Sequence, residues 1–216
     1  MRKLVKVCGL TEGDNIRAVE SLGVDLTGFI FYPRSPRCVR GVPTYLPARA
    51  GRVGVFVDAS FEEILSRRDE FGLEYVQLHG SESPALCRRL RDAGLRVIKA
   101  FGVGPDGSGL PDASSEYGDA CDFFLFDTRT EARGGSGKSF DWSVLGRYAC
   151  PVPFLLSGGI GPDSVEELKK IDNKYFIGVD LNSRFESEPG VKDVDLLSVF
   201  LQSFDPDRLS GRPADE

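Results

Sequence analysis

The sequence predicts a single closed (β/α)₈ TIM barrel of the α/β class, and three observations lead to this prediction. Eight short runs rich in Val, Ile, Leu and Phe recur along the 216 residues. Charged, amphipathic segments separate these runs, and such alternation is typical of parallel strands joined by helical crossovers. The length suits one large domain and is near the roughly 250 residues of such barrels. An open, doubly wound sheet is the competing architecture.

The apolar runs are the expected strands, and the segments between them are the expected crossovers. In order, the strands cover 3–8, 25–31, 52–57, 74–79, 96–101, 122–127, 152–157 and 175–180. Helix-like segments with Asp, Ser or Glu near their starts cover 11–23, 60–72, 82–94 and 161–171. The fifth crossover, 102–120, is rich in Gly, Pro and Ser, so its helix is expected to be weak or missing. We expect 1–205 to form the barrel and 206–216 a polar C-terminal tail.

Net charge and cysteine spacing argue against several classes of function. At a net charge of −6, the chain has no basic field for nucleic acid or an anionic membrane. Lys6 interrupts the N-terminal apolar run before it reaches the length of a signal peptide, and the rest of the chain contains no apolar run of greater length. We therefore expect a soluble, cytoplasmic protein. The five cysteines are odd in number, scattered and without a C-x-x-C pair, which argues against a disulfide framework and a structural zinc site.

Polar residues lie at the ends of the expected strands. In a (β/α)₈ barrel the chemistry takes place at the C-terminal ends of the strands. Strand alternation directs Lys6 and Cys8 into the barrel. The same parity gives inward positions to four more polar residues: Gln77, His79, Asp127 and Asp180. We therefore expect polar side chains to converge at one mouth of the barrel.

Three of these residues have both a structural and a chemical interpretation. Cys8 is either a small core residue or, facing solvent beside Lys6, a thiol with a lowered pKa that acts as a base or nucleophile. His79, the only histidine, is either a satisfied core residue or a substrate contact. Asp127 follows four apolar residues, where desolvation favours the protonated, proton-donating form, and otherwise caps the next loop.

Two glycine-rich segments suggest contact with phosphate. The segment "ARGGSGKS", 132–139, differs from the P-loop pattern at one residue, because Ala132 stands where the pattern has glycine, and it follows the sixth strand. A mobile lid over the barrel mouth is therefore favoured over the phosphate loop of a nucleoside triphosphatase. In "LSGGIGPDSV", 156–165, Gly158 and Gly159 allow a ligand to approach the backbone. With "DLNSRF", 180–185, this segment occupies the loops where such barrels bind phosphate through backbone N–H groups and a helix N-terminus.

The motifs together resemble those of the phosphoribosylanthranilate isomerase family of tryptophan biosynthesis. In chain order they are "KVCGLT", "GFIFYPRSPRCV", "VQLHGSES", "VIKAF", "FLFDT" with "GGSGKSFDW", "LSGGIGPDSV" and "GVDLNSRFESEPGVKD", spanning 6–193. The resemblance implies a (β/α)₈ barrel that converts N-(5′-phosphoribosyl)anthranilate to 1-(2-carboxyphenylamino)-1-deoxyribulose 5-phosphate by an Amadori rearrangement. It implies neither a metal nor an organic cofactor.

The resemblance also implies roles for single residues. Cys8 matches the family's general base, Asp127 its general acid, and Arg37 the residue that binds the anthranilate carboxylate. Further substrate contacts are expected from Lys6, His79, Asp180, Gly158, Gly159, Ser183 and Arg184, the last four in the phosphate loops after strands 7 and 8. The expected partner is a small phosphosugar, with no nucleic acid and no membrane, and the protein is expected to be a monomer or a homodimer.

One position departs from the family pattern. Arg184 stands where many relatives have a glycine beside the phosphate, so it either strains that loop or adds a phosphate contact. Other interpretations are a related phosphosugar barrel, such as aminoimidazole-carboxamide ribotide isomerase or indole-glycerol-phosphate synthase, and a barrel kept only for binding. The first uses an Asp where Cys8 stands. Indole-glycerol-phosphate synthase relies on Lys and Glu residues not found here. The presence of a candidate base, a candidate acid and two candidate anion sites argues against a barrel kept only for binding.

Overall fold

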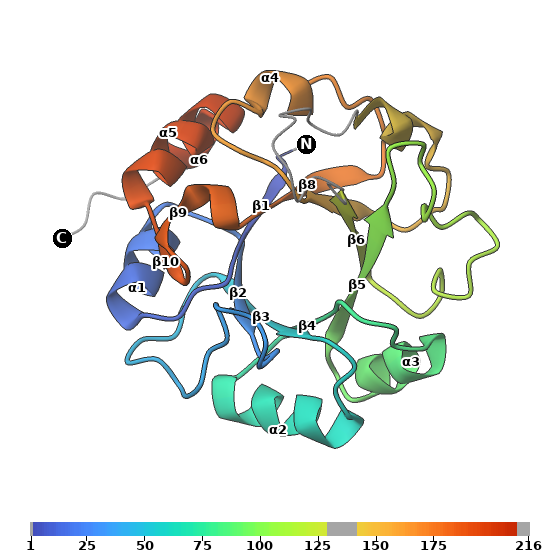
Figure 1. The fold of residues 1–216 in the computed structure, drawn as a ribbon, viewed down its shortest axis with the longest axis horizontal. Helices are drawn as coiled ribbons and strands as arrows, with labels where there is room; N and C mark the ends of the chain where they lie inside the picture. The colour runs from blue at the N-terminus through green and yellow to red at the C-terminus, as the bar shows by residue number, and fades with distance from the viewer. Residues whose placement is uncertain (1, 129–141, 211–216) are drawn as a thin grey trace.

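Eight parallel strands close into a barrel in the computed structural model, which describes residues 2–128 and 142–210 (Figure 1). The strands are β1 (Leu4–Cys8), β2 (Leu26–Ile30), β3 (Gly51–Phe56), β4 (Tyr75–Leu78), β5 (Arg96–Val103), β6 (Phe123–Thr128), β7 (Phe154–Ser157) and β8 (Phe176–Leu181). Each pairs with the next in chain order, and β8 pairs with β1. The closed barrel is confirmed, and the doubly wound sheet is excluded.

The helices surround the barrel (Figure 1). They are α1 (Gly13–Ser21), α2 (Phe61–Phe71), α3 (Pro84–Asp92), α4 (Val165–Leu168), α5 (Val194–Phe204) and α6 (Asp207–Ser210), with 3₁₀ helices η1 (Trp142–Arg147) and η2 (Ser183–Phe185). Side-chain caps mark three starts: Ser60, Ser83 and Asp193 each accept a hydrogen bond from a backbone N–H three residues on. A small hairpin, β9 (Glu186–Glu188) and β10 (Val191–Lys192), follows η2.

The crossovers are less helical than an ideal barrel. As predicted, the fifth has no helix between β5 and β6. The helix expected over 161–171 is reduced to α4, because a turn closed by the Gly161 N–H on Ser164 Oγ delays its start. The expected lid, 132–139, lies outside the described residues. In the described part of the chain, no helix has the length and apolar character needed to cross a membrane.

Apolar side chains form two cores, one inside the barrel and one between the strands and the surrounding helices. Inside, a cluster of inward residues closes the lower part of the barrel: Leu26, Val53, Ile98, Ala100, Leu125 and Leu155. Outside, a larger core that includes Val5 and Val7 packs under the helices. Near the other end the inward residues include polar ones, as the strand parity predicts, among them buried Lys6, Gln77 and Asp180, beside the apolar Ile30 and Val55. Polar chemistry is thus confined to one mouth of a packed barrel.

The beginning of the expected tail is helix α6. Its Arg208 side chain is buried and donates hydrogen bonds to the carbonyls of Lys3 and Gly23 and, at 2.8 Å, to Asp25 Oδ2. Asp25 in turn accepts the N–H of Val5 on β1. This contact ties the end of the described chain to the N-terminal end of the barrel.

Candidate active site

A cavity of about 210 Å³ opens among the C-terminal ends of the strands, and we call it the mouth cavity. Its walls come from β1 to β4 and from the ends of β6, β7 and β8 with their following loops. The lining residues are Cys8, Ile30, Val55, Gln77, His79, Asp127, Ser157, Gly158, Gly159, Ile160, Asp180, Asn182, Ser183 and Arg184. Of the predicted site residues, it brings together all but Lys6 and Arg37.

Cys8 reaches the mouth cavity from the end of β1, but its thiol is buried. Gly28, its register partner on β2, makes room for the sulfur: a Cβ at Gly28 would lie 2.7 Å from Cys8 Sγ. Burial raises the pKa of the thiol, and the charges of Lys6 and Lys192 offset only part of this effect. The expectation of a solvent-facing thiol with a lowered pKa is therefore wrong. Free of substrate, Cys8 is a neutral thiol.

Lys6 is a buried ion-pair partner and does not line the mouth cavity. Its Nζ lies 2.8 Å from Oδ1 of Asp180, and both side chains are buried. Although burial alone would lower the pKa of Lys6, the negative charge of Asp180 and its hydrogen bond to Nζ raise it, so the ammonium stays protonated. Asp180 neutralises this charge, which explains why Lys6 cannot hold Cys8 as a thiolate. Only Asp180 of this pair borders the space where a substrate can lie.

Asp127 is held by His79, which is in turn held by Gln77. His79 Nε2 lies 3.2 Å from Asp127 Oδ2, and the Gln77 amide nitrogen lies 3.0 Å from His79 Nδ1. Gln77 is buried and its Oε1 has no hydrogen-bond partner among the described residues, whereas Asp127 is 36% exposed. The apolar strand therefore does not desolvate the Asp127 carboxyl, contrary to expectation, since β6 ends at the cavity. The row of three side chains aims the carboxyl into the cavity.

The loops after β7 and β8 form the remaining wall. Gly158 and Gly159 have φ of 79° and 73°, a conformation that favours glycine. Ser183 and Arg184 are exposed, and Asp58 is the only non-glycine residue with a positive φ in the described ranges, so Arg184 does not strain its loop. Instead, its guanidinium lies against Gly161, where a Cβ would be 2.5 Å from Arg184 Nε. Helix α4 is a single turn and offers no extended helix N-terminus, and Ser183 and Arg184 are among the side chains that border the cavity here.

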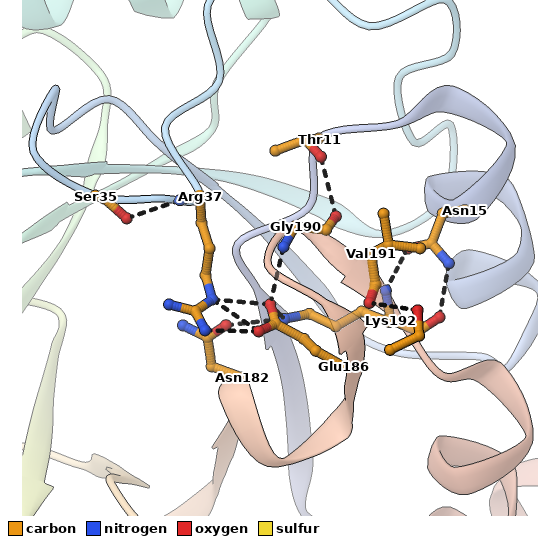
Figure 2. Close-up of polar contacts among 10 residues, drawn as sticks. Thr11, Asn15, Ser35, Arg37, Asn182, Glu186, Gly190, Val191 and Lys192 are labelled. Carbon is orange, nitrogen blue, oxygen red and sulfur yellow. Dashed lines mark hydrogen bonds and ion pairs between the residues drawn. The ribbon is translucent and has the colours of Figure 1, made fainter.

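Arg37 lies beside the mouth cavity and is part of a polar network that Figure 2 shows. Gly9, which follows Cys8, has φ of 79°, and a Cβ there would be 2.8 Å from Arg37 Cδ and 2.9 Å from Asn182 Oδ1. Glu186 accepts hydrogen bonds from Arg37 Nε at 2.9 Å and from Nη2 at 2.6 Å. Lys192 donates to the same carboxylate at 2.6 Å and to Asn182 Oδ1 at 2.8 Å.

Four residues of this site had no role in the sequence analysis beyond a place in a motif or a strand. Glu186, Lys192 and Asn182 fall in the quoted segment "GVDLNSRFESEPGVKD", and Gln77 was only placed inside the barrel. The one signal available for Glu186 and Lys192 was a pair of opposite charges around a Pro-Gly turn. The hairpin β9–β10 that brings them to Arg37 is not visible in the strand pattern, because its strands have three and two residues.

The arrangement brings a thiol and a carboxyl to one cavity, with arginine side chains and glycine-rich loops around it. Cys8 and Asp127 border one cavity from β1 and β6, which β7 and β8 separate in the closed barrel. The guanidinium of Arg37 suits a carboxylate, and the glycine-rich loops with Arg184 suit a phosphate. Among the described residues, no cluster of three or more His, Cys, Asp or Glu side chains could hold a metal ion.

Comparison with known proteins gives a consistent picture. A sequence model of the "N-(5'phosphoribosyl)anthranilate (PRA) isomerase" family matches residues 5–203. N-(5′-phosphoribosyl)anthranilate isomerase of Phocaeicola vulgatus is 48% identical over 198 residues, 92% of this chain and 96% of its own. The enzyme of that name from Parabacteroides distasonis is 45% identical over 205 residues, 92% of each chain.

Solved structures agree in fold. Phosphoribosyl anthranilate isomerase from Thermotoga maritima has a TM-score of 0.74 at 33% identity, covering 95% of this chain and 100% of its own. Another phosphoribosyl anthranilate isomerase was solved in complex with reduced 1-(o-carboxyphenylamino)-1-deoxyribulose 5-phosphate. It has a TM-score of 0.72 at 32% identity, with the same coverage. The chain therefore belongs to the N-(5′-phosphoribosyl)anthranilate isomerase family.

Proposed function

We propose that this chain isomerises N-(5′-phosphoribosyl)anthranilate to 1-(2-carboxyphenylamino)-1-deoxyribulose 5-phosphate, with Asp127 as general acid and Cys8 as general base. The observation that carries the assignment is that a carboxyl and a thiol line one cavity from strands separated by two others. An aldose-to-ketose rearrangement needs an acid at the ring oxygen and a base at C2′. Well-placed groups of these types each contribute about 10² to 10⁴ in rate.

The first step opens the sugar. Asp127 gives its proton to the furanose ring oxygen while the bond between that oxygen and C1′ breaks, and the anilino nitrogen supplies the electrons of the new C=N bond. The product is a protonated Schiff base. His79 donates to the Asp127 carboxylate that remains, at the 3.2 Å contact already present, and so stabilises the conjugate base.

The second step removes the proton on C2′. In the free site the Cys8 thiol is neutral, because burial raises its pKa. The positive iminium formed by ring opening lies one carbon from C2′ and favours the thiolate. The Cys8 thiol loses its proton to solvent in the cavity that it lines, so the base becomes competent after the acid has acted. Transfer of the C2′ proton to sulfur gives a neutral enolamine. Loss of the hydroxyl proton at C2′ and gain of a proton at C1′ then give the ketone.

The two anions of the substrate bind at separate places. Arg37 takes the anthranilate carboxylate beside Cys8, and the backbone around Gly158 and Gly159, with Ser183 and Arg184, takes the phosphate. We place Asp180 at the sugar, held by Lys6. We propose that the chain acts in the cytoplasm as a monomer or homodimer, and a related isomerase from Thermotoga maritima is described as dimeric.

Turnover of freshly generated N-(5′-phosphoribosyl)anthranilate, followed by the loss of anthranilate-type fluorescence, tests the function. Wild type should consume the substrate rapidly, whereas Cys8→Ser and Asp127→Asn should each be slower by about 10² or more while remaining folded. Near-normal turnover in either variant removes that residue from the mechanism. No turnover by folded wild type contradicts the function, and turnover of the phosphoribosylformimino derivative of aminoimidazole-carboxamide ribotide instead would favour the other isomerase.

A further inference from the structure

Three charged side chains meet near Cys8, one from the loop after β2 and two from the hairpin β9–β10, and we call them the charge triad: Arg37, Glu186 and Lys192 (Figure 2). The Glu186 carboxylate lies at the centre, 2.6 Å from Arg37 Nη2 and 2.6 Å from Lys192 Nζ. The Glu186 side chain is 4% exposed and that of Lys192 is 0% exposed. Arg37 is 20% exposed, so it is the one member that a ligand can reach.

The charge triad carries one net positive charge. Burial alone would raise the pKa of Glu186, but hydrogen bonds from Arg37 and Lys192 lower it, so the carboxyl is ionised. Burial lowers the pKa of Lys192, and Glu186 opposes this effect and favours the ammonium. Two cations and one anion remain. Without Lys192, Arg37 and Glu186 would form a neutral pair with no net attraction for a second carboxylate.

The hydrogen bonds also orient Arg37. The edge of the guanidinium that carries Nε and Nη2 donates to Glu186. The other edge, formed by Nη1 and the second hydrogen of Nη2, is left for another acceptor. Among the described residues, no hydrogen bond from Arg37 Nη1 is found. That edge can donate two parallel hydrogen bonds to a carboxylate. The fork of Glu186 and the packing of Gly9 against Arg37 Cδ hold the guanidinium in this position.

Lys192 is fixed by contacts that do not involve the substrate. Its backbone N–H donates to Asn15 Oδ1 and its carbonyl accepts from Asn15 Nδ2, both at 2.8 Å, which ties β10 to α1 (Figure 2). Its Nζ also donates to Asn182 Oδ1, and Asn182 lines the mouth cavity. A buried lysine held at both ends cannot reach a ligand itself. Its effect on binding must pass through Glu186 and Asn182.

We propose that Lys192 is a positioning and specificity residue for the carboxylate subsite, acting through Glu186 to keep that subsite net positive and Arg37 aimed. The inference rests on the proposed function, since it concerns the anthranilate carboxylate. It predicts a preference for a carboxylated substrate over the same substrate without the carboxylate. That preference should depend on the net charge of the charge triad and not on the presence of a lysine as such.

The test uses two substrates and three proteins. N-(5′-phosphoribosyl)anthranilate and N-(5′-phosphoribosyl)aniline, prepared from ribose 5-phosphate and the two amines, differ only in the carboxylate. Lys192→Gln keeps a hydrogen-bond donor for Glu186 but makes the charge triad neutral, and Glu186→Gln/Lys192→Gln restores one positive charge. The quantity compared is the ratio of kcat/KM for the two substrates. Because the Lys192 charge also favours the Cys8 thiolate, we expect Lys192→Gln to slow the turnover of both substrates. The ratio of the two kcat/KM values cancels this common effect and isolates the effect of the carboxylate.

We expect Lys192→Gln to lower this ratio about tenfold or more, mainly through a higher KM for the carboxylated substrate. The double variant should return the ratio to within about threefold of wild type. An unchanged ratio in Lys192→Gln, or a ratio that stays low in the folded double variant, overturns the proposal. If Lys192→Gln does not fold, the double variant alone decides, because a purely structural role predicts a low ratio there. Wild type that turns over neither substrate contradicts the proposed function instead.

Discussion

Nζ of Lys6 lies 2.8 Å from Oδ1 of Asp180 inside the barrel, where both side chains are buried, and the pair sets the charge around Cys8. The negative charge of Asp180 raises the pKa of the Cys8 thiol, while the positive charge of Lys6 lowers it. The state of the thiol therefore depends on a carboxylate that also borders the substrate cavity.

We predict that Asp180→Asn lowers the pKa of Cys8, because it removes a nearby negative charge and leaves the charge of Lys6 uncompensated. The rate of alkylation by iodoacetamide, measured for the Cys8 peptide by mass spectrometry as a function of pH, should reach its midpoint at lower pH than in wild type. Asp163→Asn, at an exposed position, is the control and should leave the midpoint in place. An unshifted midpoint in Asp180→Asn would contradict the prediction.

The contact of Gln77 with His79 predicts a definite imidazole tautomer. The Gln77 amide nitrogen faces Nδ1, so the neutral ring should carry its hydrogen on Nε2 and donate it to Asp127. Because His79 is the only histidine, nitrogen NMR of untagged protein labelled at histidine reports this ring alone. Gln77→Glu, which presents an acceptor to Nδ1, should place a hydrogen on Nδ1 as well, because Asp127 still accepts the hydrogen on Nε2. The control Gln202→Glu, at an exposed position, should not, and a wild-type ring protonated on Nδ1 would contradict this account.

Gly28 determines where the Cys8 sulfur sits. An alanine Cβ would lie 2.7 Å from Sγ and 3.1 Å from Cα of Cys8, so either the sulfur or strand β1 must move. We expect Gly28→Ala to lower kcat by about 10², as misplacement of a reacting group by about 1 Å does, and to destabilise the fold by about 1–3 kcal/mol. Gly146→Ala, where a Cβ meets nothing within 4 Å, is the matched control. Wild-type kcat in Gly28→Ala would show that the sulfur position is not critical.

The sequence predicts the direction of a site side chain where that direction follows from strand parity. The inward direction of Lys6, Cys8, Gln77 and Asp180 follows from alternation along parallel strands, and the structure confirms it. The burial of Cys8 does not follow, because it depends on Gly28 across the β1–β2 ladder and on the ion pair that neutralises Lys6.

The charge triad was beyond sequence reasoning for a different reason. Arg37 and Glu186 are 149 residues apart, and both lie where the chain has left the eight-strand pattern. Only the packing of the loop after β2 against the hairpin after β8 brings them together. The partners of Arg208 at the opposite end of the barrel are likewise remote in sequence: Lys3 precedes β1, and Gly23 and Asp25 lie between α1 and β2.

Arg208 should contribute strongly to stability. Its side chain is 0% exposed, and its loss removes a buried charged donor from Asp25 and from the carbonyls of Lys3 and Gly23. We expect Arg208→Met to lower the free energy of unfolding in urea by about 3 kcal/mol. Arg2→Met is the matched control, because Arg2 pairs with the same Asp25 and with Asp205 but is 56% exposed, and its loss should cost less than about 1 kcal/mol. Equal effects of the two substitutions would contradict this distinction.

Arg184 provides the last prediction, on the phosphate. Its guanidinium is 54% exposed at the mouth cavity, with Asp163 at 3.8 Å as an exposed partner, so it is available to a phosphate bound by the loops after β7 and β8. We expect Arg184→Gly to raise KM for N-(5′-phosphoribosyl)anthranilate about fivefold with kcat unchanged, as loss of an exposed ion pair would. The difference should shrink with added salt, because screening weakens such a contact, and Arg184→Lys should retain part of it. Arg67→Ala, on the outer helix α2, serves as the control for loss of a positive charge. A lower kcat with unchanged KM would place Arg184 in the chemistry of the reaction rather than in the binding of its phosphate.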